Sequence, residues 1–416
     1  MKKMKRRIDH SWDFANVDTK YCTHGIHPYP AMMIPQVSHR LIAEYGKDAK
    51  KALDPFCGSG SVLLEFETAG VDSYGIDINP LAAMMSRVKT KPLSPAVLRK
   101  KIIQIKDRIS DYSSGKPVSI VDFQNLDFWF KPQVIRDLSL IRRAIDLEKD
   151  VAFREFFLVC FSETVRKASN TRGSEFKLYR IAKEKLALHN PNAKQIFLNV
   201  VERNISGMTS LFEISQNKSL GNVAVINADA MHPVGIPEKS IDLIVSSPPY
   251  GDSRTTVAYG QFSRLSLQWL GFPREKVIDL DNRMLGGKPT PDFSFDFSSP
   301  TLDKIVKEIA KIDDLRAREV LSFYVDFQKA AIEINKLMRS KSTVCLVVGN
   351  RTVKGIQIPT DEIMAEIFQG FGYLHGETIV RRIPSKRMPI RNSPSNVVGK
   401  TLSTMNEEYI VILTRK

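Results

Sequence analysis

Short apolar runs recur along the chain, and each ends in a small or acidic residue. Continuous apolar runs are typical of strands that are buried on both faces of a parallel sheet. Segments with helical spacing separate several of these runs, which predicts an α/β fold with a doubly wound, mostly parallel sheet. The predicted strands are Lys51–Leu53, Ser73–Ile78, Val223–Asn227, Ile241–Ser246 and Thr343–Val348, followed by a closing antiparallel pair, Thr378–Ile383 and Glu408–Leu413.

The clearest helical pattern runs from Leu302 to Met338, with a break expected near Asp313. Its apolar side chains recur along one stripe of a helix, which we interpret as a face buried in the core and not as a ligand surface. The stripe consists of Phe323, Phe327, Ala330, Ile334 and Leu337.

Two segments exceed what a minimal sheet domain needs. The segment 90–220 looks largely helical, because its apolar residues follow helical spacing around Leu138 and Ile145 and again around Phe157. The segment 251–300 is rich in Gly, Pro, Asp and Ser, which predicts loop. We therefore divide the chain into a first half of the sheet domain (1–90), a helical insert (91–220) and a second half with the loop-rich segment and the closing strands (221–416).

Composition limits the class of protein and of partner. The apolar fraction of 43% and the charged fraction of 26% are ordinary for a globular protein, which excludes a disordered, collagen-like or disulfide-scaffold chain. Lys and Arg outnumber Asp and Glu by 61 to 46, for a formal charge of +15. This excess favours a polyanionic partner such as nucleic acid, although a basic soluble enzyme would also carry it.

Signals for export, membranes or metals are weak. The four cysteines lie far apart without a CxxC pair, so we expect no disulfide frame and no structural zinc. His24 and His27 form a short HxxH, which is a poor metal site without further ligands at suitable spacing. The basic start MKKMKRR is not followed by an apolar stretch, and no apolar run reaches membrane-spanning length. The sequence predicts a cytoplasmic protein without a membrane or metal partner.

A glycine-rich loop follows the first predicted strand. It reads Asp54-Pro55-Phe56-Cys57-Gly58-Ser59-Gly60 and precedes a predicted helix, Val62–Glu67. Glycines there allow a ligand to approach the backbone and offer N–H groups at a helix N-terminus. The loop is neither a P-loop nor a GxGxxG motif. Asp77, at the end of the next strand, is placed where a carboxylate can accept both hydroxyls of a ribose.

A second loop, Ser247-Pro248-Pro249-Tyr250, directly follows an apolar strand. Its two prolines fix φ, prevent the strand from continuing and hold the Ser247 hydroxyl and the loop carbonyls in place. An amino group on an aromatic ring is a poor nucleophile, and two acceptors on its hydrogens would favour the tetrahedral nitrogen that can attack. Tyr250 offers a ring on which an extracted base could stack.

Together these residues resemble those of the S-adenosylmethionine-dependent amino-group DNA methyltransferases, and among them the cytosine-N4 enzymes of restriction–modification systems. The segment THGIHPYPA at 23–31 also resembles the segment of this family that folds over the methionine half of the cofactor. The glycine loop precedes the tetrapeptide here, which is the reverse of the order in many members. The resemblance implies a Rossmann-like methyltransferase sheet and a cofactor site formed by Thr23, His27, Tyr29, Asp54, Pro55, Phe56, Cys57, Gly58, Gly60, Asp77, Ile78, Asp229 and Ala230.

The resemblance implies that Ser247, Pro248, Pro249 and Tyr250 are catalytic, and Ser in the first position favours cytosine N4 over adenine N6. Methylation of adenine N6 or of an RNA amino group stays open, as does a non-catalytic nucleic-acid-binding protein with a degenerate fold. The intact loops argue against the degenerate reading, and the short segment before Asp54 argues against an RNA enzyme with a leading RNA-binding domain. A C5-cytosine mechanism is disfavoured because the chain has no Pro-Cys pair.

The expected partner is double-stranded DNA, and a separately acting restriction endonuclease is a possible second partner. The insert 90–220 is our first choice for the target-recognition region and 251–300 is the second. Basic residues in both regions and near the C-terminus are candidate phosphate contacts. They are Arg166, Lys167, Arg172, Arg254, Arg381, Arg382, Lys386 and Arg387.

Overall fold

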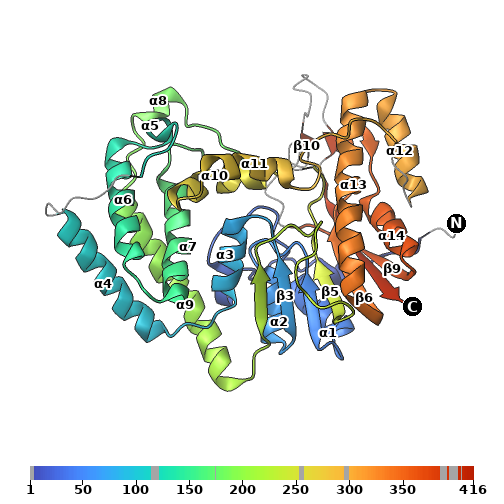
Figure 1. Cartoon of the computed structure of the whole chain (residues 1–416), viewed down its shortest axis with the longest axis horizontal. Coiled ribbons are helices and arrows are strands. Elements are labelled where there is room, and N and C mark those ends of the chain that lie inside the picture. The colour runs from blue at the N-terminus through green and yellow to red at the C-terminus, as the bar shows by residue number, and fades with distance from the viewer. Residues whose placement is uncertain are drawn as a thin grey trace.

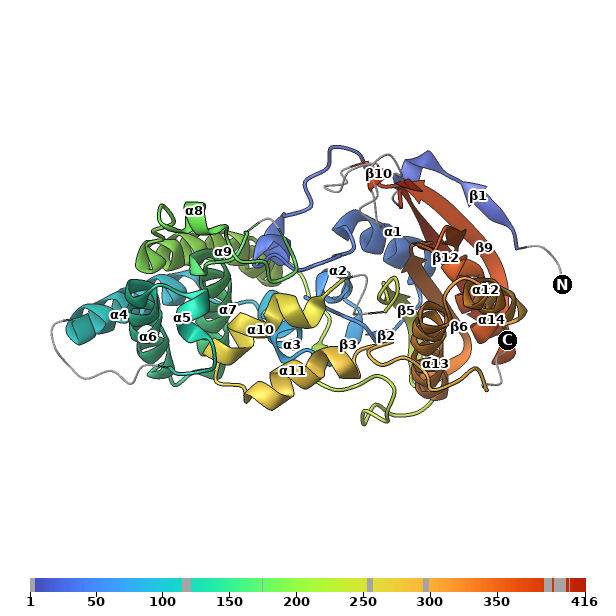
Figure 2. The ribbon, with the colours of Figure 1, turned by 90° about the horizontal axis from the view of Figure 1, so that it is seen from above.

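The computed structural model describes residues 4–113, 121–173, 175–252, 257–294, 299–384, 391–392, 402–403 and 405–416. The main strands are β1 (Arg6–Ile8), β2 (Lys51–Asp54), β3 (Asp72–Ile76), β4 (Val223–Ile226), β5 (Ile241–Ser246), β6 (Met338–Val348), β9 (Tyr373–Arg382) and β12 (Glu407–Arg415). They form one eight-stranded sheet in the order β1-β9-β12-β6-β5-β2-β3-β4 (Figures 1 and 2). Two separate two-stranded pairs are β7 (Thr352–Val353) with β8 (Ile356–Gln357), and β10 (Arg391–Asn392) with β11 (Leu402–Ser403).

Neighbouring strands from β4 to β6 are all parallel. β12 lies antiparallel between β6 and β9, as expected for the closing pair. The predicted mostly parallel sheet with an antiparallel last strand is therefore confirmed. Because parallel strands end at the same edge, the loops after β2, β3, β4 and β5 meet at one side of the sheet.

Helices cover both faces of the sheet. Successive side chains of a strand point to opposite faces, and accordingly Leu243 and Val245 pack with α1 (Pro35–Tyr45) and α2 (Ser61–Thr68). Ile244 packs on the other face, in the core formed with α12 (Pro300–Ala310), α13 (Asp314–Leu337) and α14 (Thr360–Gly370). The predicted break at Asp313 is confirmed, since its carboxylate caps α13 by accepting a hydrogen bond from the Arg316 N–H at 3.0 Å.

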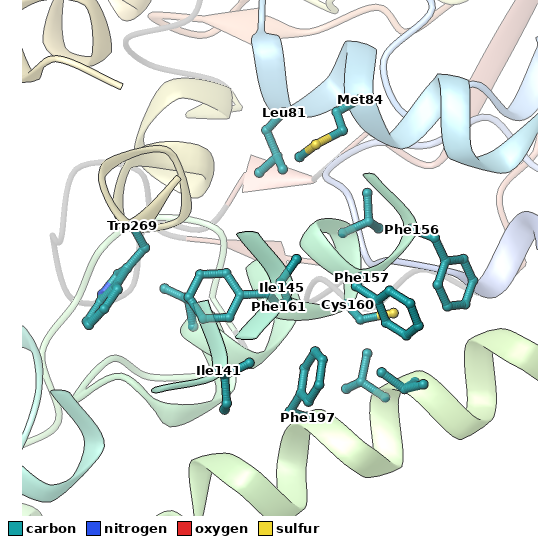
Figure 3. Packing of buried hydrophobic residues seen from close by; sticks show 14 of the residues in the cluster. Leu81, Met84, Ile141, Ile145, Phe156, Phe157, Cys160, Phe161, Phe197 and Trp269 are labelled. Atoms are coloured by element: carbon teal, nitrogen blue, oxygen red, sulfur yellow. The ribbon is translucent and has the colours of Figure 1, made fainter. Parts of the chain in front are cut away.

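The segment between β3 and β4 is helical, as predicted. It contains α3 (Pro80–Lys89), α4 (Pro95–Ser113), α5 (Leu126–Trp129), α6 (Pro132–Asp146), α7 (Val151–Ala168), α8 (Lys183–Leu186) and α9 (Ala193–Asn217). Figure 3 shows part of its core, where Phe156, Phe157 and Phe161 of α7 lie near Phe197 of α9. Leu81 and Met84 of α3 belong to the same core, so the helical unit is packed onto the sheet domain through α3.

The expectation of loop over 251–300 is wrong for much of the described part. This segment contains α10 (Tyr259–Trp269) and α11 (Arg274–Arg283), which run from the helical unit towards α13 (Figures 1 and 2). Phe262, Leu265 and Trp269 of α10 are buried at helical spacing, and Trp269 packs against Phe130 and Phe161. Some of the residues that suggested a loop lie within these helices, among them Gly260 and Ser263 in α10 and Asp281 in α11.

A short edge strand was not predicted. β1 pairs parallel with β9, although its residues are two arginines and one isoleucine and all three are exposed. Arg6 forms an ion pair with Asp361 at 2.8 Å, and Arg7 forms one with Glu377 at 2.9 Å. Part of the basic N-terminal run is therefore bound to the sheet domain. None of the helices in the described residues is both long and apolar enough to cross a bilayer.

Candidate functional site

A pocket of about 960 Å³, partly open to solvent, lies at the carboxyl ends of β2, β3, β4 and β5. Five chain segments line it: the N-terminal segment, the glycine loop, and the loops after β3, β4 and β5. Residues from the end of α11 complete it. The lining residues are Tyr29, Pro30, Ala31, Met32, Met33, Asp54, Pro55, Phe56, Cys57, Gly58, Ser59, Ser61, Val62, Asp77, Ile78, Ala228, Asp229, Ala230, Met231, Ser247, Pro249, Tyr259, Arg283, Met284 and Leu285.

The glycine loop needs both of its glycines. Gly58 has a φ of +52°, and a Cβ there would lie 3.3 Å from the Tyr29 ring. Gly60 has a φ of +81°, and its Cβ would lie 2.8 Å from Ser86. Left-handed backbone strains a side chain at either position, and at Gly60 the Cβ would also overlap Ser86, so glycine allows the loop to bend sharply and begin α2 at Ser61.

Asp77 connects the glycine loop to the next strand. One carboxylate oxygen accepts a hydrogen bond from the Gly58 N–H at 2.9 Å and the other accepts one from the Asn79 N–H at 2.8 Å. Burial raises the pKa of Asp77 to about 6, although both backbone hydrogen bonds oppose this shift. The carboxylate is held rigidly at the pocket wall, where its remaining lone pairs can accept from ligand hydroxyls.

Asp54 is a second buried carboxylate in the pocket wall. It accepts hydrogen bonds from the Ser246 hydroxyl at 2.6 Å and the Phe56 N–H at 3.2 Å. Burial raises the pKa of Asp54 to about 7. A cationic ligand group beside Asp54 would stabilise its ionised form.

The far end of the pocket lies beyond β4. Asp229 and Ala230 line it, as does Ile78 after β3. The Asp229 carboxylate accepts a hydrogen bond from the Met231 N–H at 3.0 Å, and the Asn227 amide donates to the Asp77 carbonyl at 2.8 Å. These contacts join the two loops into one wall.

Three of the predicted cofactor residues do not line the pocket. Thr23 is buried and its hydroxyl donates to the Lys89 carbonyl at 2.7 Å. The His27 ring is buried between the Pro28 carbonyl and the Ser162 hydroxyl. Gly60 shapes the loop behind the wall. The N-terminal segment reaches the pocket instead through Tyr29 and the four residues that follow it.

The Ser-Pro-Pro-Tyr tetrapeptide, predicted to be catalytic, lies only partly in the pocket. Ser247 and Pro249 line the pocket, whereas Pro248 and Tyr250 do not. The Ser247 hydroxyl lies 3.3 Å from Tyr250 Oη, and Tyr250 Oη donates to Glu408 Oε1 at 2.9 Å. Burial, with the Glu408 carboxylate beside it, raises the pKa of Tyr250 well above its usual value, so the phenol remains a donor.

Two of the predicted phosphate contacts, Arg166 and Arg381, bind other parts of the protein. Arg166 donates to the Phe262 carbonyl at 2.7 Å and the Glu175 carbonyl at 3.2 Å, and its guanidinium lies 3.8 Å from the centre of the Phe262 ring. Arg381 is only 3% exposed and binds the Trp12 carbonyl and Glu408. Both guanidinium groups donate hydrogen bonds to other segments of the protein, so they are poorly placed to bind phosphates.

The other predicted phosphate contacts are exposed or lie outside the described residues. Lys167 pairs with Glu163 at 2.8 Å and Arg172 with Glu175 at 3.3 Å, and each is about half exposed. Arg382 is exposed at the carboxyl end of β9, the same sheet edge as the pocket. Arg254, Lys386 and Arg387 lie outside the described residues.

Some pocket residues were not anticipated from the sequence. Tyr259 begins α10, and Arg283, Met284 and Leu285 lie at the end of α11, in the segment expected to be loop. The apolar spacing of Phe262, Leu265 and Trp269 would have indicated the first of these helices. Ser59 lies in the predicted loop and Ser61 directly before the predicted helix, and neither was assigned a role.

The arrangement fits a nucleoside-containing cofactor. The glycines allow the loop backbone to lie close to Tyr29, and Asp77 presents a fixed carboxylate. The pocket extends from the loop after β4 to Ser247 after β5. His24 binds Glu65 while His27 binds Ser162, so the HxxH pair does not converge. No group of three metal-ligating side chains occurs among the residues described.

Comparisons with known proteins agree with this geometry. A family model described as a DNA methylase, for N6 and N4 enzymes, matches residues 1–86. Type II methyltransferase M.MvaI of Kocuria varians is 43% identical over 422 residues, covering 96% of this chain and 92% of that protein. Type II methyltransferase M.MjaII of Methanocaldococcus jannaschii is 31% identical over 92 residues, which is 22% of this chain and 17% of that protein.

Among solved structures, the rRNA methyltransferase aviRa of Streptomyces viridochromogenes covers 98% of this chain and 93% of its own, at 11% identity and a TM-score of 0.32, a value too low to indicate function. The assignment rests on the sequence matches. The chain belongs to the amino-group DNA methyltransferases of restriction–modification type.

Proposed function

We propose that the protein transfers a methyl group from S-adenosylmethionine to the exocyclic N4 amino group of a cytosine in a short duplex DNA sequence. The observation that carries this proposal is that Ser247 lines the same pocket as Asp77 and the glycine loop. Cofactor and base would then meet at the carboxyl ends of adjacent strands. Ser in the first position of the tetrapeptide supports cytosine N4 over adenine N6.

The cofactor would lie along the sheet edge. Asp77 would accept the ribose hydroxyls, and Ile78, Asp229 and Ala230 would enclose the adenine. When bound, S-adenosylmethionine supplies an electrophilic methyl group. The order β5-β2-β3-β4 places Ser247 two strands away from Asp77, so the base would approach from the opposite end of the pocket.

The protein's contribution at the base would be positioning. The Ser247 hydroxyl and the Pro248 carbonyl would accept hydrogen bonds from the amino group, which favours a tetrahedral nitrogen with an available lone pair. The base must leave the duplex to reach a pocket at a sheet edge, and the Tyr250 ring would stack on it. The nitrogen would attack the methyl carbon in line as the carbon–sulfur bond breaks, which leaves S-adenosylhomocysteine and releases one amino proton to solvent, so no covalent intermediate with the enzyme is needed.

Digestion of methylated DNA to nucleosides, followed by mass spectrometry, tests the proposal. We expect N4-methylcytosine. N6-methyladenine as the only product would show that the target is the N6 amino group of adenine. Parallel assays on DNA and RNA distinguish the substrate class. Titration with S-adenosylmethionine by calorimetry tests the degenerate, non-catalytic alternative, which predicts no binding.

The role in the cell would be modification. A type II methyltransferase of this kind would protect the host's own recognition sites from a separately acting endonuclease. Expression in cells followed by challenge of their DNA with endonucleases of matching specificity tests this role. Cleavage of every site in methylated DNA would contradict it.

A further inference from the structure

Lys89, the last residue of α3, is a buried cation beside the glycine loop. Its side chain is 1% exposed, and its ammonium lies 3.3 Å from the Ser59 hydroxyl and 3.4 Å from the Ser61 hydroxyl. Both distances exceed the range of about 2.7–3.2 Å that is usual for N–H···O hydrogen bonds. The hydroxyls therefore give the ammonium only weak compensation for the water it has lost.

A buried ammonium is ordinarily paired with a carboxylate, because burying an isolated charge is costly. In the described part of the chain, no ion pair joins Lys89 to an acidic side chain. Burial lowers the pKa of Lys89 to about 7, with only a slight opposing influence from the Cys57 thiol. An anionic group brought by a ligand would supply the missing partner.

The position of Lys89 is fixed from outside the pocket. The Thr23 hydroxyl donates to the Lys89 carbonyl at 2.7 Å, which ties the end of α3 to the N-terminal segment. Lys89 is not itself among the residues that line the pocket, but Ser59 and Ser61, the two hydrogen-bond partners of its ammonium, both line it. Ser61 also begins α2, whose first N–H groups point out of the helix end and favour negative charge.

The other parts of the pocket are assigned to the ribose, the adenine and the base, so the part beside Ser59 and Ser61 is available for the amino-acid part of the cofactor. Asp77 and Asp229 lie after β3 and β4, and Ser247 lies after β5. With the ribose at Asp77 and the methyl group near Ser247, the remaining part of S-adenosylmethionine must lie against the glycine loop and Tyr29. That part carries the carboxylate.

We propose that Lys89, with the Ser59 and Ser61 hydroxyls, binds the carboxylate of the amino-acid part of the cofactor. The inference rests on the proposed use of S-adenosylmethionine and assigns one group of that molecule to one corner of the pocket. It also gives Thr23 a role, because Thr23 positions Lys89 without touching the ligand.

Calorimetric affinities for two ligands test the assignment: S-adenosylmethionine and its decarboxylated form, which lacks only the carboxylate. The wild-type protein should prefer S-adenosylmethionine by about tenfold to a hundredfold, the range expected for charged hydrogen bonds. Lys89→Met should lose this preference and bind both ligands with similar affinity. Lys100→Met, which removes an exposed lysine from α4, is the matched control and should keep the preference.

The outcomes separate the two proposals. If Lys89→Met keeps the wild-type preference, the carboxylate assignment is wrong while the cofactor assignment stands. If the wild-type protein binds neither ligand, the proposed function fails and the carboxylate assignment fails with it.

A structure of the wild-type protein with S-adenosylhomocysteine provides a second measurement that does not depend on a variant folding. We expect a carboxylate oxygen within about 3.2 Å of Lys89 Nζ. A carboxylate directed away from Lys89, Ser59 and Ser61 would overturn the inference.

Discussion

Tyr250 Oη donates a hydrogen bond of 2.9 Å to Glu408 Oε1, which joins the loop after β5 to the start of strand β12. The other carboxylate oxygen of Glu408 pairs with Arg381 of β9, and Arg381 in turn binds the Trp12 and Asp13 carbonyls. The N-terminal segment is thus connected through the Arg381 and Glu408 side chains to the Ser-Pro-Pro-Tyr tetrapeptide. This series of hydrogen bonds and ion pairs fixes the position of the Tyr250 ring, on which the base is proposed to stack.

Replacing Glu408 should therefore slow turnover without weakening cofactor binding. Glu408→Ala removes the acceptor of the Tyr250 hydrogen bond and leaves Arg381 buried without its ion partner. We expect kcat to fall by about tenfold or more, while the affinity for S-adenosylmethionine changes little. Steady-state kinetics and calorimetry measure the two quantities. Glu408→Gln keeps an acceptor for Tyr250 and should recover part of kcat, and equal loss in both variants would refute a positioning role.

The tetrapeptide itself should carry the chemistry. Ser247→Ala removes an acceptor for the amino group, and we expect kcat to fall by about a hundredfold, as for loss of one preorganised hydrogen-bonding group. Tyr250→Ala should be as severe because the stacking ring is lost. Both variants should bind the cofactor normally, since neither side chain is assigned to it. Full activity in either variant would contradict the role that we assign to it.

Cofactor-site affinity should depend on pH through Asp77. Its pKa is raised to about 6 by burial, so the empty site takes up a proton as the pH falls through 6. Ribose hydroxyls donate best to the ionised carboxylate, so affinity should be constant above pH 7.5 and decrease below about 6.

Binding of 5′-methylthioadenosine measures this dependence, because that ligand keeps the ribose and lacks the amino-acid part that would lie nearer Asp54. Asp77→Asn should bind more weakly and show a flat profile across this range. A wild-type affinity that does not change between pH 5.5 and 8 would contradict the assignment of Asp77 to the ribose.

DNA affinity should fall steeply with salt, and individual arginines should contribute differently. Arg172→Ala and Arg382→Ala remove exposed guanidinium groups, so each should reduce the slope of log affinity against log salt by about one if it contacts a phosphate. Arg339→Ala, at the opposite edge of the sheet, is the matched control and should leave the slope unchanged. A flat salt dependence of the wild-type protein would count against phosphate contacts altogether.

Arg166 should behave as a residue of the interior. Arg166→Ala would leave the Phe262 and Glu175 carbonyls without their donor and would remove the contact with the Phe262 ring. We expect the free energy of unfolding to fall by about 2–3 kcal/mol, measured by urea denaturation. If the variant kept its unfolding free energy and showed a reduced slope of log DNA affinity against log salt, Arg166 would be a phosphate contact after all.

The sequence predicted the parts of the fold that have a periodic apolar pattern. The five central parallel strands and the long helix pair around Asp313 were found because burial on both sides leaves continuous apolar runs or stripes. β1 was missed because an edge strand of two arginines has no such pattern, and its pairing with β9 depends on ion partners such as Asp361 and Glu377.

The site was predictable where chemistry depends on a local motif. Residues 54–58 belong to the glycine loop and Ser247 belongs to the Ser-Pro-Pro-Tyr motif. The structure brings both motifs into one pocket with Asp77. The hydrogen-bond partners of Arg166, Arg381 and Lys89 come from other elements of the fold. The burial of these side chains could therefore not be predicted from the sequence. A basic residue in sequence indicates charge, but only tertiary contacts show whether that charge faces solvent, a carbonyl or a pocket.

Sequencing the modified bases in the genome of cells that express the protein is the most direct test of the central claim. We expect N4-methylcytosine at one fixed position of one short sequence, and its loss in cells that express Ser247→Ala. N6-methyladenine alone, or no modified base with the wild-type protein, would contradict the claim.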